Sequence, residues 1–211
     1  MRYTIISDLH LTNKFDNTKL KAIKNIIEDT DQIIINGDFW DGYFIKFDQF
    51  YSSEWSKLFP LLKAKKCYYV FGNHDCEDKN NLNKIRTFCD GYGNQLDIEI
   101  NKVKYHIEHG HRFFYTLDNI FTEIQQKVAS LYYGLGTKIL KEIFWKQYNY
   151  QNKKMYQKLT NIYPNFKFIT SHSHFPININ DTLYNTGMIN YGLLQYIVIN
   201  ENQIDIIKAR Y

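Results

Sequence analysis

Four short apolar runs punctuate the chain, and a polar block rich in Asp, Asn or His follows each of them within three residues. The runs cover residues 3–6, 32–35, 68–71 and 166–170. Near-continuous apolar strands that are separated by helical stretches are typical of a parallel sheet covered on both faces. The pattern therefore predicts that each polar block lies at the carboxyl end of a strand, where side chains from neighbouring strands converge.

Helical spacing of apolar residues fills the stretches between the first runs. Residues 17–29 predict one helix, and residues 48–65 and 80–89 predict two more. Such helices would cover the faces of the sheet. The apolar face of the first predicted helix consists of Leu20, Ile23, Ile26 and Ile27.

Later segments are arranged around short polar turns. Residues 96–100 and 103–108 flank one turn, and residues 197–199 and 204–207 flank another. Both pairs predict antiparallel hairpins. Together with the parallel runs they predict an α/β fold, a sandwich of two mixed β-sheets flanked by helices.

Residues 112–160 interrupt this pattern. Two helical repeats of apolar residues lie on either side of Gly134 and Gly136, so the segment is expected to be an inserted helical hairpin. It holds eight Lys or Arg and three Asp or Glu, whereas the formal net charge of the whole chain is +4. Three interpretations stay open: a packed hairpin with a solvated Lys face, a cap that faces lipid or an acylated substrate, and, least favoured, a nucleic-acid surface.

The length of 211 residues fits a single domain at 1–211 that includes the insert. Three irregularly spaced cysteines argue against a disulfide framework and fit a reducing compartment. No apolar stretch reaches the roughly 18 residues that a membrane span needs, and the first run begins too early for a signal peptide. We therefore expect a cytoplasmic protein whose only contact with a membrane would be peripheral, through the insert.

All seven histidines lie in short blocks that also hold Asp, Asn or Gly. Histidines used for packing would be scattered, so this distribution indicates a metal site. Asp, Asn and imidazole form the mixed set of oxygen and nitrogen ligands that suits Mn, Fe or Zn. The blocks are Asp8-Leu9-His10, Gly72-Asn73-His74-Asp75, residues 106–111 and His172-Ser173-His174, joined by Gly37-Asp38-Phe39-Trp40-Asp41, which has carboxylates but no histidine.

The spacing suggests how two ions would be shared. Asp8 and His10 are two positions apart in an extended segment, so they point the same way and would hold a first ion. Two ions about 4 Å apart can bind both the attacking and the leaving oxygen of a phosphoryl displacement, and they require a carboxylate that bridges them. Asp38 is then the natural bridge. Asn73 adds a ligand without adding charge. The remaining ligands would be His109, His172 and His174.

In this order, the motifs Asp-x-His, Gly-Asp-x-x-Asp, Gly-Asn-His-Asp, His-Gly and x-His-x-His resemble those of the calcineurin-like metallophosphoesterases. The resemblance implies that His74 is a catalytic imidazole near the leaving oxygen and that Asp41 orients it. It also implies one ion held by Asp8, His10, Asp38 and His174, and a second held by Asp38, Asn73, His109 and His172.

Some positions depart from the common phosphatase form. That form has Arg where this chain has Gly42, so another cation is expected to take its place. Asp41-Gly42-Tyr43, together with the insert, resembles the branch that contains the UDP-2,3-diacylglucosamine diphosphatases of lipid A synthesis, in which the insert caps the site and holds acyl chains. Known members of that branch have Arg at the position of His74.

Three more polar residues lie close to these motifs. His106 is expected to be a packed or exposed strand residue instead of a ligand, because its neighbours alternate. His111 is left open between a contact with substrate and a supporting contact. Asp75 either orients His74 or is an exposed or capping residue of the following turn.

The sequence thus predicts a dinuclear metal-dependent phosphoesterase that hydrolyses a phosphoester or pyrophosphate bond by a metal-activated hydroxide. Two divalent ions are the expected cofactors, with Mn favoured and Fe or Zn as alternatives. The expected partner is a phosphorylated small-molecule or lipid-linked substrate. The alternatives are a UDP-2,3-diacylglucosamine diphosphatase, a nucleotide or nucleic-acid phosphodiesterase, and a non-catalytic metal-bound scaffold that binds a protein through the insert.

Overall fold

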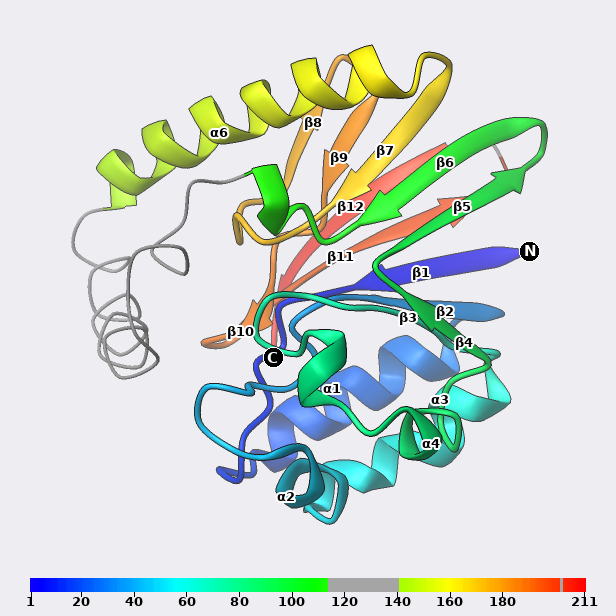
Figure 1. The fold of residues 1–211 in the computed structure, drawn as a ribbon, viewed down its shortest axis with the longest axis vertical. Coiled ribbons are helices and arrows are strands. Elements are labelled where there is room, and N and C mark those ends of the chain that lie inside the picture. The colour runs from blue at the N-terminus through cyan, green and yellow to red at the C-terminus, as the bar shows by residue number, and fades with distance from the viewer. Residues whose placement is uncertain (114–140, 202) are drawn as a thin grey trace.

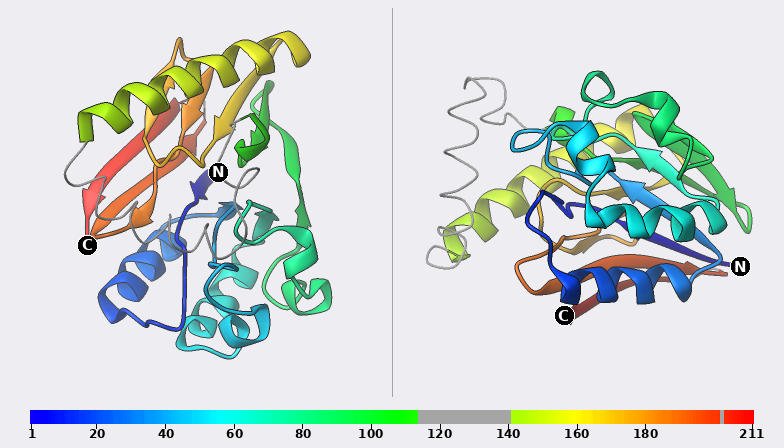
Figure 2. Two further views of the ribbon diagram at one scale, coloured as in Figure 1. Left: turned by 60° about the vertical axis from the view of Figure 1, so that its left-hand side comes forward. Right: turned by 90° about the horizontal axis from the view of Figure 1, so that it is seen from below.

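Two mixed β-sheets pack face to face, and helices cover the outer face of each (Figures 1 and 2). The structure is a computed structural model that describes residues 1–113, 141–201 and 203–211. The α/β sandwich expected from the sequence is confirmed. The single-domain organisation stays a prediction.

The first sheet has the strand order β10-β11-β1-β2-β3-β4, with β12 paired to β11. Strands β1 to β4 run parallel, whereas β11 is antiparallel to β1, and this makes the sheet mixed. The first three predicted apolar runs thus form neighbouring parallel strands, whereas the fourth, at 166–170, is a strand of the second sheet. The strands are β1 (Arg2–Ile6), β2 (Gln32–Asn36), β3 (Tyr68–Val70), β4 (Gly91–Gly93), β10 (Ile189–Asn190), β11 (Leu193–Asn200) and β12 (Gln203–Arg210).

The second sheet has the order β5-β6-β7-β9-β8. Strands β6, β7 and β9 are parallel, and β5 and β8 are antiparallel to their neighbours. Both predicted hairpins are present, β5 with β6 in this sheet and β11 with β12 in the first. The strands are β5 (Gln95–Ile100), β6 (Val103–Glu108), β7 (Phe166–Thr170), β8 (Ile177–Ile179) and β9 (Leu183–Asn185).

The apolar runs are continuous because each face of the first sheet is buried. Ile5 and Ile34 face the second sheet, whereas their neighbours Ile6, Ile33 and Ile35 face the helices. Successive side chains of a strand point to opposite faces, so a strand buried on both sides has no polar positions to alternate with. Polar residues then appear where the strand ends.

Short helices cover the outer face of the first sheet. The predicted helix at 48–65 is wrong in its continuity: it is three pieces, because the Ser53 hydroxyl donates to the Phe50 carbonyl and accepts from the Trp55 amide, which ends one helix and starts the next. The first predicted helix is confirmed. The elements are α1 (Asn17–Glu28), α2 (Phe47–Tyr51), η1 (Glu54–Leu58), α3 (Phe59–Ala64), η2 (Glu77–Lys79) and α4 (Leu82–Ile85).

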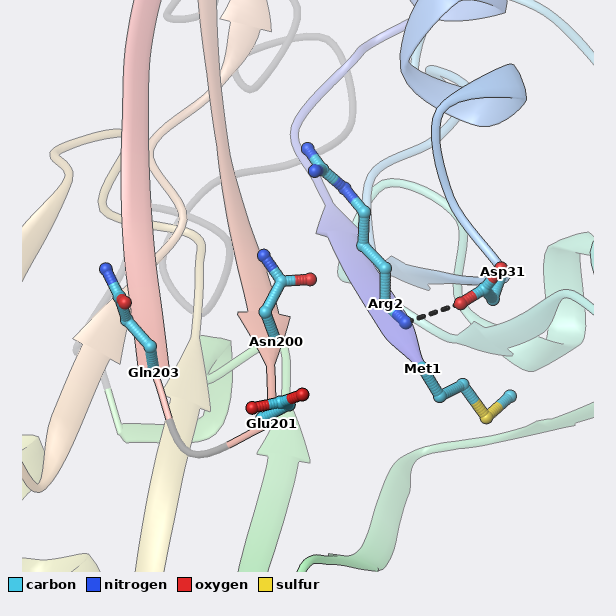
Figure 3. Close-up of a pocket in the computed structure, with 6 residues that line it drawn as sticks. All are labelled: Met1, Arg2, Asp31, Asn200, Glu201 and Gln203. Atoms are coloured by element: carbon cyan, nitrogen blue, oxygen red, sulfur yellow. Dashed lines mark hydrogen bonds between the residues drawn. The ribbon is translucent and has the colours of Figure 1, made fainter.

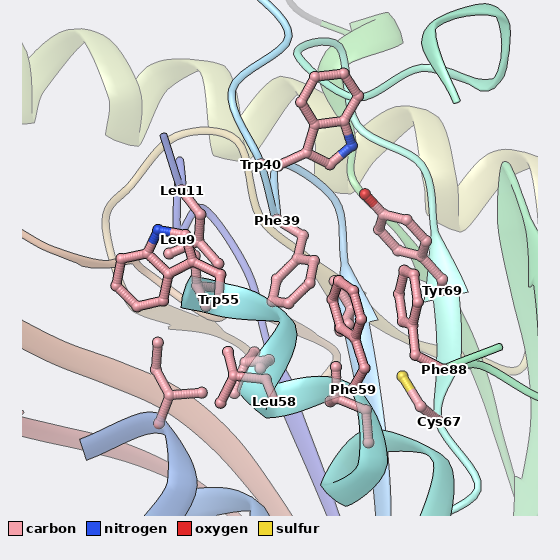
Figure 4. Packing of buried hydrophobic residues seen from close by; sticks show 14 of the residues in the cluster. Leu9, Leu11, Phe39, Trp40, Trp55, Leu58, Phe59, Cys67, Tyr69 and Phe88 are labelled. Atoms are coloured by element: carbon pink, nitrogen blue, oxygen red, sulfur yellow. The ribbon is translucent and has the colours of Figure 1, made fainter. Parts of the chain in front are cut away.

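Aromatic side chains pack among Ile and Leu in the core between this sheet and its helices (Figure 4). Phe39 and Trp40, which directly follow Asp38, are at most 1% exposed and pack edge-on or stacked against Phe50. The block that carries Asp38 is therefore anchored to the core by its own neighbours.

Helix α6 (Lys141–Ile162) lies across the outer face of the second sheet (Figures 1 and 2). Met155 and Leu159 on this helix pack against Phe168 and Leu183 of the sheet. The second half of the predicted hairpin is thus a helix, while residues 114–140 lie outside the described part. Within the described ranges, no helix has the combination of length and apolar character that crossing a membrane requires.

Candidate metal centre

The predicted ligands meet at one edge of the sandwich. Asp8, Asp38 and Asn73 follow the parallel strands β1, β2 and β3 of the first sheet, while His109 and His172 follow β6 and β7 of the second. Because the carboxyl ends of all these strands lie on the same side, the loops that follow them converge between the two sheets.

Five of the predicted ligands in these loops have left-handed backbone. The φ angles lie between 46° and 64° at Asp8, His10, Asp38, His172 and His174. Non-glycine residues rarely adopt this region, and surrounding structure must hold them there, so such residues cluster at functional sites. Here the holding contacts are backbone hydrogen bonds, since both the Leu9 and the His10 amides donate to the Asp38 carbonyl at 2.9 Å.

Asp8, His10 and His174 form a first cluster of potential ligands. The His174 Nε2 atom lies 3.0 Å from Asp8 Oδ1 and 3.3 Å from His10 Nε2. The other oxygen of Asp8 accepts from the Ser7 hydroxyl at 2.6 Å, which orients the carboxylate. One oxygen of Asp8 is thus left facing the two imidazoles.

Asp38, His109 and His172 form a second cluster. The His109 Nε2 atom lies 3.3 Å from Asp38 Oδ2 and 3.2 Å from the side-chain oxygen of Asn73. The same Asp38 oxygen lies 3.8 Å from His10 Nε2 in the first cluster. Asp38 therefore stands between the two clusters, where the sequence predicts a bridge.

These distances fit divalent ions. Donor atoms around one ion, with bonds of about 2.1 Å, stand about 3.0–3.4 Å apart in tetrahedral or octahedral geometry, and the closest approaches in both clusters fall in this range. The tautomer of His109 also fits, because its Nδ1 atom lies 2.9 Å from the Asn36 carbonyl and must donate to it. In the neutral form of the ring, that leaves the lone pair on Nε2, the atom that faces Asp38 and Asn73.

The electrostatics favour positive charge in the centre. Burial opposes protonation of His109, but the carboxylates of Asp38 and Asp8 raise the pKa of this imidazole to about 10. Burial, together with the charge of His109, holds the pKa of His172 well below its usual value, so His172 is a neutral imidazole, the form that binds metals. Burial alone would raise the pKa of Asp38, but the surrounding imidazoles outweigh this effect and hold the pKa well below its usual value.

His74 lies at the rim of the centre, where it forms a third group of potential ligands with His10 and Asp41, and it belongs to neither of the first two clusters. Its Nδ1 atom is 2.9 Å from Asp41 Oδ1, while its Nε2 atom is 3.9 Å from Asp38 Oδ2. The other Asp41 oxygen is 3.5 Å from His10 Nδ1. Burial opposes ionisation of Asp41, but hydrogen bonds to His10 and His74 lower its pKa below the ordinary value. One carboxylate therefore orients a predicted ligand and the predicted catalytic imidazole together.

Asp75 plays a different part from either role expected of it. It is fully buried, and its carboxylate accepts from the backbone amides of Asp38, Phe39 and Gly72 at 2.7–3.0 Å as well as from the Tyr69 hydroxyl. It fixes the Asp38 loop and not His74. The expectation of an orienting, exposed or capping residue is wrong, because the sequence around Asp75 gives no sign that a distant loop folds over it.

Sequence reasoning also missed Ser171, whose hydroxyl donates to the Asn36 carbonyl at 2.7 Å and lies 2.8 Å from His109 Nδ1. A small polar residue beside a histidine motif was the available signal. His106 is a buried strand residue, with Nδ1 at 2.5 Å from Asp97 and Nε2 at 3.3 Å from Glu108, and lies outside both clusters. The His111 ring lies 5.5 Å from the His109 ring, next to the second cluster.

A separate polar pocket of about 650 Å³ opens at the far end of β1 (Figure 3). It lies beside Arg2 and Asp31, at the start of β1 and β2, whereas the clustered ligands follow the ends of these strands. No predicted site residue lines it.

The family model described as calcineurin-like phosphoesterase matches residues 1–207 of the chain. Among solved structures, Yfce, a phosphoesterase from E. coli, is similar with a TM-score of 0.52 and 13% identity, over 98% of this chain and 92% of that one. Vacuolar Protein Sorting 29 from Cryptosporidium parvum is similar with a TM-score of 0.50 and 10% identity, over 100% and 97%. These two likenesses show the fold alone. The search of curated proteins gave no match.

Proposed function

Since the chain belongs to the calcineurin-like phosphoesterase family, we propose that it hydrolyses a phosphoester or pyrophosphate bond with two divalent metal ions. The family and the His/Asp clusters support a metal-dependent phosphoesterase in general. The observation that carries the finer proposal is the position of Asp38, whose Oδ2 atom lies 3.3 Å from His109 in one cluster and 3.8 Å from His10 in the other.

The residues would divide between two ions that share Asp38. When bound, such ions lower the pKa of a water molecule toward neutrality and neutralise charge on the phosphoryl oxygens. Asn73 keeps the second set of ligands less negative, which favours an anionic substrate. One ion would be held by Asp8, His10, Asp38 and His174, and the other by Asp38, Asn73, His109 and His172.

His74 would assist the departing oxygen. Asp41 accepts a hydrogen bond from Nδ1 at 2.9 Å, which fixes the ring so that Nε2 faces the centre. In its protonated form the ring donates from Nε2 to an oxygen that gains charge as the bond to phosphorus breaks. A proton donor at this position would lie beside the first two clusters and would take no ligand from them.

The substrate class is tested by a screen with Mn as the favoured metal, using phosphomonoesters, phosphodiesters, nucleotide diphosphosugars and oligonucleotides. The proposal expects turnover of at least one class that is lost on chelation and restored by Mn; Fe and Zn are compared in parallel. Turnover of oligonucleotides that falls steeply with salt would favour the nucleic-acid alternative. Bound metal without turnover of any class would favour a non-catalytic scaffold.

A lipid-linked diphosphate is the second candidate. On α6 the Tyr150 side chain is 59% exposed, and the Lys154 ammonium lies 4.6 Å from its ring centre. An exposed aromatic residue beside a cation suits an anionic, acylated substrate or membrane surface. Tyr150→Ser should then slow cleavage of a lipid-linked diphosphate in mixed micelles and leave a soluble phosphodiester unaffected. If the variant cleaved the lipid-linked diphosphate at the wild-type rate, or lost as much activity on the soluble phosphodiester, the support for this candidate would be removed.

A further inference from the structure

The imidazole of His74 is held from more than one side. Asp41 fixes Nδ1 at 2.9 Å, and the Tyr43 ring packs against the His74 ring with 4.1 Å between their centres. Tyr43 is 7% exposed, so its ring is fixed by its surroundings. The ring of His74 is therefore supported by a hydrogen bond at its edge and by the tilted ring of Tyr43.

Lys79 joins these supports at the backbone. It is half-buried at the end of η2, and its ammonium lies 4.1 Å from the centre of the Tyr43 ring. The same ammonium donates to the carbonyls of His74 at 3.3 Å and Asn73 at 3.4 Å. A single cation thus contacts both the peptide groups that flank His74 and the aromatic ring that packs on it.

Gly42 allows this arrangement. A Cβ atom at residue 42 would lie 2.2 Å from the His74 carbonyl oxygen and 2.8 Å from Cδ of Lys79. The first of these contacts is with backbone, which cannot turn aside as a flexible side chain can. The space beside residue 42 is therefore filled by the His74 backbone and the Lys79 stem, and only glycine fits there.

We propose that Lys79 is a positioning residue for His74: it clamps the backbone on both sides of His74 and holds Tyr43 against the imidazole. The inference rests on the proposed function, in which His74 donates to the departing oxygen. Displacement of the imidazole would lower kcat most for substrates whose leaving oxygen needs a proton. It would lower kcat little for substrates whose leaving group departs as a stable anion.

Lys79→Met tests this, because it keeps the length of the stem and removes the ammonium. Two phosphodiesters of the same class are compared under saturating Mn, one that releases p-nitrophenolate and one that releases an alkoxide. We expect kcat for the alkoxide substrate to fall about tenfold, a part of the rate that a general acid supplies, while kcat for the p-nitrophenyl substrate and the bound metal per chain stay near wild-type values. Lys79→Gln should behave alike, and Lys79→Arg should recover most of the activity.

Lys84→Met is the matched control. Its ammonium also lies over a tyrosine ring, 5.1 Å from the centre of Tyr51, and pairs with Asp48 at 2.8 Å, but it contacts no predicted site residue. Both substrates should be cleaved as by the wild type. His74→Ala should show the same preference for the good leaving group as Lys79→Met, more strongly.

Equal losses on both substrates, loss of metal, or wild-type rates in both Lys79→Met and Lys79→Gln would overturn the inference while the wild-type activity stands. A wild-type chain that cleaves neither diester, nor any other phosphoester, under Mn would instead contradict the proposed function and remove the basis of this inference with it.

Discussion

Asp41 shows how much one buried side chain contributes at the scale of single residues. Its two oxygens face His74 at 2.9 Å and His10 at 3.5 Å, so it supports the predicted catalytic imidazole and one predicted ligand. The sequence indicates the first role through the family resemblance of the Gly-Asp-x-x-Asp motif. It does not indicate the second, because His10 lies 31 positions away and only the fold brings the two together.

Asp41→Asn keeps the shape of this side chain and removes its charge. We expect kcat to fall about 10- to 100-fold, because outer partners of ligand and catalytic imidazoles contribute about this much. Measurements of kcat and of bound metal by elemental analysis check this. Retention of full activity would show that Asp41 does not set the orientation of either ring.

Lys19 supports the first ligand loop from behind. It is 5% exposed, and its ammonium donates to the Leu9 carbonyl at 2.5 Å and to the Asn190 side chain at 3.2 Å. Leu9 lies between two residues in left-handed backbone, Asp8 and His10. The loop therefore depends on a buried lysine, whose pKa burial lowers to about 7, and which sequence patterning assigned only to a helix.

Lys19→Met should weaken binding of one of the two ions about tenfold, because the loop carrying Asp8 and His10 is no longer held by its carbonyl. Titration calorimetry with Mn measures the effect. Lys65→Met is the control, since Lys65 donates to the Thr30 carbonyl at 2.6 Å in a part of the chain away from the clusters. Identical Mn binding in Lys19→Met and the control would contradict this role.

At the scale of elements, α6 is joined to the ligand loop of the second sheet. The buried Asn152 amide of α6 donates to the Ser173 hydroxyl at 3.1 Å, between His172 and His174. Asn185 of β9 donates to the Ser171 carbonyl at 2.7 Å on the other side of the loop. The helix predicted as part of an insert therefore also packs against the metal centre.

A second set of contacts links β5 and β6 to Tyr163, the residue that directly follows α6. His106 on β6 bonds to Asp97 on β5 and to Glu108, and its ring stacks on Tyr163 with 4.3 Å between centres. Burial opposes protonation of His106, but the hydrogen bonds to Glu108 and Asp97 raise its pKa above the ordinary value of 6.5. The charged form is therefore favoured by folding.

The contribution of His106 to stability should depend on pH. Because the folded pKa is raised, this contribution is fully present below about pH 6.5 and is lost as the pH rises through the folded value. The difference in unfolding free energy between wild type and His106→Gln, measured by urea denaturation in chelator, should be largest near pH 5.5 and shrink toward pH 9. A difference that is constant over this range would show that protonation of His106 does not stabilise the fold.

At the scale of the whole molecule, the sequence patterns predicted the features that depend on residues close together in the chain. Apolar runs buried on both faces predicted four of the parallel strands, and most ligands lie in the loops that follow them, while His109 follows a strand predicted as part of a hairpin. Contacts between distant segments had no local sign: Asp75 holding the Asp38 loop, Lys19 reaching Asn190, and Asn152 reaching Ser173. The break at Ser53 was missed because a side-chain hydrogen bond outweighed the helical spacing of its neighbours.

The proposed dinuclear metal centre depends on Asp38 as a ligand shared by two ions. The most direct test measures bound Mn per chain and phosphodiester turnover together in the wild type and in Asp38→Ala, with Asp48→Ala, an exposed carboxylate paired with Lys84, as the control. We predict two ions and turnover in the wild type and control, and loss of both metal and activity in Asp38→Ala. Two bound ions with full turnover in Asp38→Ala would contradict the proposal that both ions depend on Asp38.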